Sequence, residues 1–192
     1  TCAAELQRLF ADDESGGFFT TGVDAEPLIV RPQDFFDNAT PSENSLAADA
    51  LLRLAALAGD ASLESGPRRV LSLMRDVIAQ HATGFAFMLG AYERAVLPPI
   101  EVAIVGRAGP ARDALASVVR HRLLPASVAL VSDATPSPDV PLLAGRTEVE
   151  GRPAAYVCER FACRRPVTDP DALAEELDAA LALDLVGGPR QA

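Results

Sequence analysis

Apolar residues recur at helical spacing through the first half of the chain. Side chains three or four positions apart share one face of a helix, so this spacing predicts helices that each bury at least one face. The predicted helices of this half cover residues 1–10, 41–58, 66–81 and 83–97. The second and fourth are apolar around most of their circumference, whereas the third has a distinct polar face. This succession predicts a layered α/α arrangement, of which a double ring of helices is one form.

The helix predicted over residues 41–58 begins at a capping sequence, Thr40-Pro41-Ser42-Glu43. A threonine before a proline at the first helical position, with a glutamate at the third, can satisfy the free amides of the first turn. We therefore expect Thr40 to be the N-cap of this helix and Gly59 to end it.

The pattern changes after the prolines at positions 98 and 99. Two apolar runs, over 100–106 and 128–132, flank a segment of helical period over 110–123. A strand, a helix and a strand joined by short connections predict a right-handed parallel βαβ unit.

A hairpin and a last helix are predicted after this unit. Residues 147–149 and 154–158 lie on either side of the turn sequence Glu150-Gly151, which favours a hairpin. Asp169 before a proline predicts the N-cap of the last helix. The expected fold class is therefore mostly α with an α/β portion. Its expected parts are a helical segment over 1–98, a small α/β unit over 99–168, and a C-terminal helix with a tail over 169–192.

Composition excludes several classes of function. The formal net charge of the 192 residues is −10, whereas a nucleic-acid-binding surface needs clustered positive charge, so no nucleic-acid partner is expected. No apolar run approaches the roughly 20 residues that span a bilayer, and a basic segment followed by an apolar stretch is absent, so no membrane partner is expected. Three cysteines are too few for a disulfide scaffold, which favours a cytoplasmic location. His81 and His121 are far apart and no zinc or cofactor motif is present, so no metal and no cofactor are expected.

Cys158 and Cys163 are one candidate for chemistry, because three arginines at 160, 164 and 165 stand close to them. Nearby cations favour the thiolate, which is the reactive form of cysteine. A turn between the two residues would bring the sulfurs within bridging distance. The favoured alternative is that both are small apolar residues at the end of a buried strand.

Polar residues around the start of the helix over 41–58 are a second candidate. Carboxylates in the mouth of a ring of helices can act as acid and base in sugar chemistry when burial separates their pKa values. The candidate catalytic residues are Asp37 and Asp24, and the candidate substrate-binding residues are Arg31, Asn38 and Asn44. Helix capping and turn formation explain the same residues without any substrate, and we hold this reading slightly ahead.

Glycines 106 and 109 lie where a phosphate-binding loop would lie, between a strand and a helix. The glycine motif is incomplete and Pro110 removes one amide donor, so an ordinary strand-to-helix turn is favoured over nucleotide binding.

Four motifs occur in a fixed order along the chain. They are Gly16-Gly-Phe-Phe-Thr20, Asp24-Ala-Glu-Pro-Leu-Ile-Val-Arg-Pro32, Asp37-Asn-Ala-Thr-Pro-Ser42 with Asn44-Ser45, and Cys158-Glu-Arg-Phe-Ala-Cys163 with Pro166-Val167. Together they resemble the C-terminal part of the spermatogenesis-associated thioredoxin-domain family, over residues 9–181. Glu43 departs from this pattern, because glycine is expected at its position in most relatives.

The resemblance implies that the chain is the end segment of an (α/α) barrel, similar to those of N-acylglucosamine epimerases and six-hairpin glycosidases, with an α/β unit attached. It also implies that the family's thioredoxin-like domain is not in this sequence. The chain begins at Thr1 rather than at a methionine, which fits a trimmed chain or a fragment. A partial ring leaves apolar helix faces open, so we expect contact with the remainder of the full-length protein or self-association.

The function expected from this reading is a barrel segment that contributes to a carbohydrate-type pocket for a small polar substrate. Its carboxylates would transfer protons, while Arg31 and the asparagines would orient a polyol. The alternatives are a thiol-redox module that uses Cys158 and Cys163, and a purely structural or interaction domain. Whether the chain is an enzyme stays open.

Overall fold

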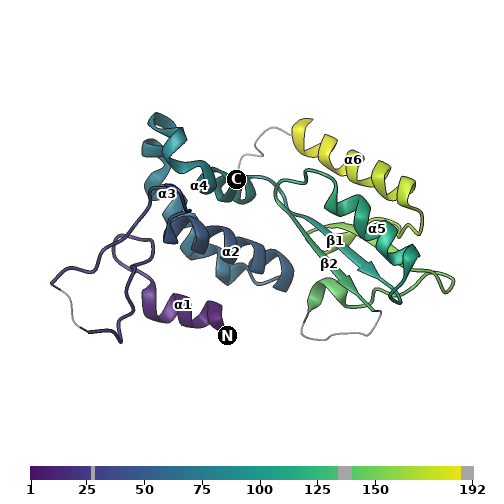
Figure 1. Ribbon diagram of the computed structural model, residues 1–192, viewed down its shortest axis with the longest axis horizontal. Helices are drawn as coiled ribbons and strands as arrows, with labels where there is room; N and C mark the ends of the chain where they lie inside the picture. Colours follow the sequence, from purple (N-terminus) through teal and green to yellow (C-terminus); the bar gives the residue numbers. More distant parts are fainter. Residues whose placement is uncertain (27–28, 134–139, 187–192) are drawn as a thin grey trace. The chain divides into compact units, whose positions relative to one another are not determined.

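The computed structural model describes residues 1–26, 29–133 and 140–186, with the side chains of 183–186 left out (Figure 1). The chain divides into two compact units. The first comprises Thr1–Ala55 and Asp60–Val96, and the second comprises Ala56–Gly59 and Leu97–Ala192. Each unit has its own hydrophobic core, so the two are described separately.

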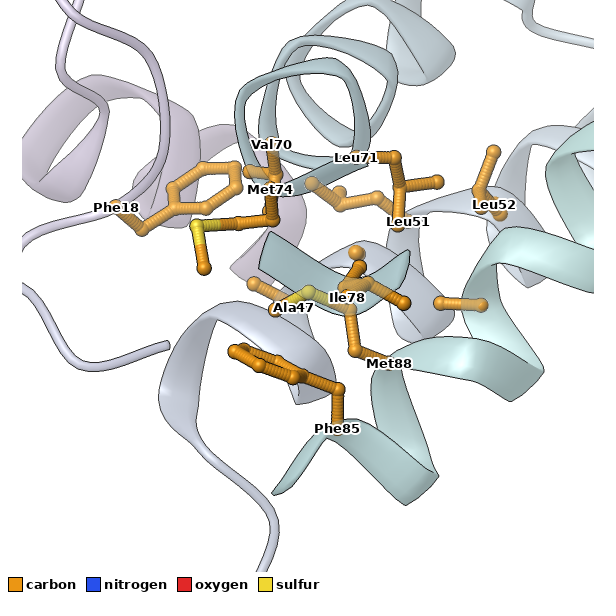
Figure 2. Packing of buried hydrophobic residues seen from close by; sticks show 12 residues of the cluster. Phe18, Ala47, Leu51, Leu52, Val70, Leu71, Met74, Ile78, Phe85 and Met88 are labelled. Carbon is orange, nitrogen blue, oxygen red and sulfur yellow. The ribbon is translucent and has the colours of Figure 1, made fainter. Parts of the chain in front are cut away.

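The first unit is helical. Its helices are α1 (Cys2–Phe10), α2 (Glu43–Ala58), which runs into the second unit, α3 (Ser65–Gln80) and α4 (Ala86–Val96), with 3₁₀ turns at Ala61–Glu64 and Ala82–Phe85. Four buried residues of α3 recur at helical spacing, namely Val70, Leu71, Met74 and Ile78. They pack with side chains from the other helices and with Phe18 and Phe85 (Figure 2). The amphipathic pattern therefore predicted both the position of α3 and the face that it buries.

The start of α2 differs from the expectation. The helix begins at Glu43, and its cap is Ser42, whose hydroxyl accepts a hydrogen bond from the backbone N–H of Ser45 at 3.2 Å. The prediction that Thr40 is the N-cap was wrong. The carboxylate of Asp37 binds the backbone N–H of Ser42 at 3.0 Å, which fixes the chain just before the helix and leaves the serine hydroxyl to cap it.

The second unit contains a four-stranded sheet in the order β2-β1-β3-β4. The strands are β1 (Ile100–Val105), β2 (Ser127–Ser132), β3 (Ala154–Glu159) and β4 (Ala162–Cys163), and α5 (Pro110–Arg120) connects β1 to β2. β1 and β2 are parallel, with Ile100 opposite Ser127 and Val105 opposite Ser132. The predicted parallel βαβ unit is confirmed.

The hairpin predicted between 147–149 and 154–158 is wrong. A tight turn does form there, with Glu150 and Gly151 at φ angles of 52° and 72°, but its arms make only the Val149–Arg152 bridge. The chain then continues as β3, which pairs antiparallel with β1. That pairing covers the free edge of β1 and buries the apolar residues of β3, which a hairpin with 147–149 would not do.

Helices α5 and α6 (Pro170–Val186) pack on one face of the sheet (Figure 1). The core between them contains Ile100, Val102, Ile104, Leu115, Ala155, Val157, Leu173 and Leu177. Asp169 caps α6 as predicted, because its carboxylate accepts from the backbone N–H groups of Asp171 and Ala172, each at 3.0 Å. The predicted tail beyond 186 lies outside the described residues. The other face of the sheet is covered in part by a 3₁₀ turn, Pro141–Leu143.

At the coarse level the fold is mixed α and α/β. Within the described ranges, no helix is both long and apolar enough to cross a bilayer.

Candidate functional site

The carboxylate of Asp37 is bound on both oxygens by backbone amides. Oδ1 accepts from Ser42, and Oδ2 accepts from Phe87 at 2.8 Å and from Met88 at 3.0 Å. The last two amides belong to the first turn of α4, where N–H groups have no partner within the helix. Burial by itself would raise the pKa of Asp37, but these donors together with the hydroxyl of Ser45 outweigh it and hold the pKa below its ordinary value. The side chain is therefore an ionised cap that ties the segment before α2 to the start of α4.

Asn44 lies in the first turn of α2 and is fully buried. Its side-chain oxygen accepts from the backbone N–H of Phe18 at 2.7 Å. Its side-chain amide donates to the carbonyl oxygens of Phe18 at 2.9 Å and Asp34 at 2.8 Å. All three contacts are to backbone groups. The Asn44 side chain thus pairs with both backbone groups of Phe18, as a neighbouring strand would, and it is not exposed to solvent.

The remaining candidates of the first unit lie apart from this pair. The guanidinium of Arg31 donates to the carbonyl oxygens of Leu9 and Thr21, and it lies 4.0 Å from the centre of the Phe19 ring. Asp24 and Asn38 are exposed. The structure thus brings Asp37 and Asn44 to the start of α2, places Arg31 in a loop contact of its own, and leaves Asp24 and Asn38 at the surface.

Cys158 and Cys163 form a disulfide bond across β3 and β4, with their Cα atoms 3.9 Å apart. Arg160 and Phe161 form the connecting turn, at φ angles of 49° and 64°. Left-handed conformations suit the tight turn of a two-residue hairpin but cost energy for residues other than glycine. Cys158 is buried, at 3% exposure, whereas Cys163 is exposed. Cys158 therefore belongs to the core, whereas Cys163 lies at the surface.

Arg146 reaches the disulfide from the segment before β3. Its guanidinium donates to the Sγ of Cys163 at 2.8 Å and to the Sγ of Cys158 at 3.6 Å. The same group donates to the carbonyl oxygen of Ala144 at 2.8 Å, which holds it in place. Sequence reasoning missed Arg146, because the arginines considered were those next to the cysteines, and only tertiary folding brings this one to the sulfurs.

Glu101 is a buried carboxylate beside the same hairpin, with 1% exposure. It lies on β1 directly opposite Cys158, and its Oε2 accepts from the backbone N–H of Phe161 at 2.7 Å. Burial raises the pKa of Glu101, although the bond from Phe161 and the charge of Arg146 oppose the increase. This residue was also missed. Its signal was available, since it is the one charged residue in the apolar run over 100–106.

Two further arginines are close to Cys163 in the chain. Arg160 and Arg165 are exposed, and neither makes an ion pair with any residue that the structure describes. Arg164, between Cys163 and Arg165, pairs with Glu176 of α6 at 3.1 Å. The disulfide hairpin, residues 158–165, is thus a positively charged region in a chain of negative net charge.

The loop between β1 and α5 is occupied by a side chain of the protein itself. The backbone N–H of Arg107 donates to the carboxylate of Glu148 at 2.9 Å. An amide that a bound phosphate would use is therefore satisfied internally, which agrees with an ordinary strand-to-helix turn. Among the described residues, no group of three or more histidine, cysteine, aspartate or glutamate side chains is placed to hold a metal ion.

Comparison with known proteins identifies similar sequences. The chain is 29% identical over 169 residues to human spermatogenesis-associated protein 20, which covers 85% of this chain and 22% of that protein. It is 29% identical to the rat protein of the same name and 28% identical to the mouse protein, over 170 residues each. The chain spans about a fifth of the length of these curated relatives. No protein-family profile matches the chain. These similarities support the resemblance to the spermatogenesis-associated family and do not bear on a relationship to epimerase barrels.

Proposed function

We propose that the second unit carries a thiol–disulfide exchange centre formed by Cys158, Cys163 and Arg146. One observation carries this proposal: a guanidinium donates to both sulfurs of a disulfide whose Cys163 is exposed. A neighbouring cation stabilises the thiolate that reduction produces, and thiolate stability and access govern exchange. In the cytoplasmic location that the composition predicts, glutathione and thioredoxin keep thiols reduced, so such a bond would form and break there.

A purely stabilising role accounts for less of this arrangement. The two cysteines are five positions apart, and a loop this short gains only about 2 kcal/mol from a cross-link, below the typical gain of longer loops. A stabilising disulfide also has no need of a cation on its sulfurs or of one exposed sulfur. Access and charge together favour exchange chemistry.

The carbohydrate pocket in the first unit stays a prediction with less support. The polar atoms of Asp37 and Asn44 are bound to backbone groups, so neither side chain is free to contact a polyol without breaking a cap. The pKa of Asp37 is lowered, whereas a general acid at neutral pH needs a raised one.

We also propose that the helices of the first unit are an end segment of an (α/α) barrel and pack on the remainder of a longer protein or on another copy. Large apolar side chains on α2, α3 and α4 support this proposal because they stay exposed. They are Leu46, Leu54, Leu73, Phe87, Leu89 and Val96. Adding the missing part of the full-length protein should protect them from solvent, which hydrogen exchange on both forms would measure.

The exchange centre is tested by redox titration of the native protein in glutathione buffers, with alkylation and mass spectrometry to count free thiols. Cys2 is exposed and free and would also react, so all measurements use protein that carries Cys2→Ser. We expect the Cys158–Cys163 pair to equilibrate as one two-electron couple without unfolding. In the reduced protein at neutral pH, Arg146→Gln should slow alkylation of Cys163 about tenfold, corresponding to one unit of thiol pKa.

Two controls separate charge from structure. Arg146→Lys keeps the charge and should restore most of the rate, whereas Arg107→Gln removes an exposed charge at the other end of β1 and should leave the rate unchanged. A bond that resists reduction until the protein unfolds, or equal alkylation rates in wild type and Arg146→Gln, would contradict the proposal.

A further inference from the structure

Cys163 is exposed, and three arginines belong to the same hairpin or contact it, which we call the arginine patch: Arg146, Arg160 and Arg165. Arg146 contacts the sulfur itself, at 2.8 Å. Arg160 lies in the turn before β4, and Arg165 follows Cys163 by two residues. Both are exposed, and in the described part of the chain neither has an acidic partner. Unpaired positive charges beside a reactive bond attract anions that approach it.

Acidic groups near the hairpin do not cancel the charges of Arg160 and Arg165. Glu101 is buried, its carboxylate accepts from the backbone N–H of Phe161, and of the three arginines it interacts with the charge of Arg146. Glu159 is adjacent to Cys158 on β3, so its side chain leaves the opposite face of the sheet. Glu176 is paired with Arg164. Apart from Glu159 on the opposite face, the exposed charges that the hairpin leaves unpaired are therefore positive, although the whole chain is negative.

We propose that the arginine patch selects small anionic thiols of the glutathione class as the reaction partners of this disulfide, with Cys163 as the sulfur that they attack. This inference rests on the exchange centre proposed above. It adds to that proposal the charge of the partner and the direction of the reaction.

The reaction balances as ordinary exchange. An incoming thiolate attacks the Sγ of Cys163, a mixed disulfide forms there, and the Cys158–Cys163 bond breaks. The electron pair of the broken bond leaves on Cys158 as a thiolate, whose Sγ lies 3.6 Å from the Arg146 guanidinium. A second small thiolate attacks the mixed disulfide at the small-molecule sulfur and releases Cys163. The protein pair is thus reduced by two electrons, and two small thiols become one small disulfide.

Burial sets this direction. Cys158 is 3% exposed and belongs to a buried cluster, so attack on it in the folded protein is disfavoured. Cys163 is on the short edge strand β4, both residues of which are exposed. The sulfur that is open to attack and the sulfur that receives the leaving charge are therefore different, and Arg146 contacts both.

The test compares three thiols of similar size and different charge on the oxidised Cys2→Ser protein. They are 2-mercaptoethanesulfonate, which is anionic, 2-mercaptoethanol, which is neutral, and cysteamine, which is cationic. The second-order rate constant of reduction by each reagent is divided by its thiolate fraction. The resulting rate constants are then compared with those of the same reagents on a small model disulfide. We expect the anionic reagent to be favoured, by about threefold for each exposed arginine, and this preference to disappear in 1 M salt.

Arg160→Gln and Arg165→Gln should each lower, by about threefold, the ratio of the rate constant of the anionic thiol to that of the neutral thiol. Arg107→Gln, which removes the same charge elsewhere, should not change this ratio. Mass spectrometry of the trapped mixed disulfide should find the reagent on Cys163. Reduction that shows no preference for the anionic reagent, or variants that leave the ratio unchanged, would overturn the inference while the exchange centre stands. A native disulfide that none of the three thiols reduces would overturn both.

Discussion

The polar cluster around Asp37 and the disulfide hairpin around Cys158 show how differently concentrations of polar and charged residues can be used. In the first, Asp37 and Asn44 make bonds to backbone groups with nearly every polar atom that they have. In the second, one cysteine of a disulfide bond is exposed, and Arg160 and Arg165 remain without acidic partners in the described residues. Polar residues cluster along the sequence in both regions. The regions differ in whether the hydrogen-bonding and charged groups already have partners within the fold.

The strongest test of this comparison is removal of the buried amide. Asn44→Ala leaves the N–H and carbonyl of Phe18 and the carbonyl of Asp34 without their partner. Since each unsatisfied buried group costs about 1–3 kcal/mol, we expect a loss of roughly 3–5 kcal/mol in the free energy of unfolding, measured by urea titration. Asn38→Ala is the matched control, because Asn38 is exposed, and it should change stability by less than about 0.5 kcal/mol. Near-equal stability of the two variants would show that Asn44 is not the scaffold residue described above.

Asp37→Asn should have the next largest effect, about 2–4 kcal/mol at neutral pH, because a neutral amide cannot accept from three backbone N–H groups as the carboxylate does. The folded-state pKa of Asp37 lies below its unfolded value. Its stabilisation is therefore present above the unfolded pKa and is lost as the pH falls through the folded pKa.

Urea titrations from neutral to acidic pH should accordingly bring wild type and Asp37→Asn together at the acid end. Asp24→Asn, at an exposed carboxylate of the same unit, should stay within about 0.5 kcal/mol of wild type at neutral pH. If Asp37→Asn retained full stability, the carboxylate would be available for another role and the catalytic hypothesis would regain support.

The smallest effect is expected for Glu101→Gln, at roughly 1 kcal/mol or less, with the opposite pH dependence. Burial places the folded-state pKa of Glu101 above its unfolded value, so its favourable contribution is complete below the unfolded pKa and is lost as the pH rises through the folded pKa. Glutamine keeps an oxygen for the Phe161 N–H and cannot ionise. The variant should therefore gain stability relative to wild type between acidic and neutral pH, which urea titrations of both proteins across that range would measure.

Elements whose signals are local could be predicted closely from the sequence. α3 and α6 begin and end near their expected positions because amphipathic spacing and the Asp169 cap act within a few residues. The parallel pair β1–β2 was also predictable, since a strand, a helix and a strand with short connections allow few arrangements.

The pairing of β3 with β1 could not be predicted in the same way. It joins segments far apart in the chain, and nothing local in the 147–158 region favours this partner over a hairpin. The same reason applies to the sulfur contacts of Arg146 and to Glu101 beside the turn, both of which exist only after the sheet has formed. For the start of α2, a contact from Asp37 decided between two candidate capping residues, Thr40 and Ser42.

The position of β3 beside β1 also affects the risk that this chain aggregates during synthesis. While β3 is missing, β1 presents a row of unpaired N–H and C=O groups beside buried apolar side chains, which is a template for pairing with other molecules. The edge that replaces it is β4, a strand of two residues that leads into two arginines and a proline, a sequence that resists such pairing. During synthesis this side of the sheet thus becomes protected from aggregation only when the segment that carries the two cysteines has been added.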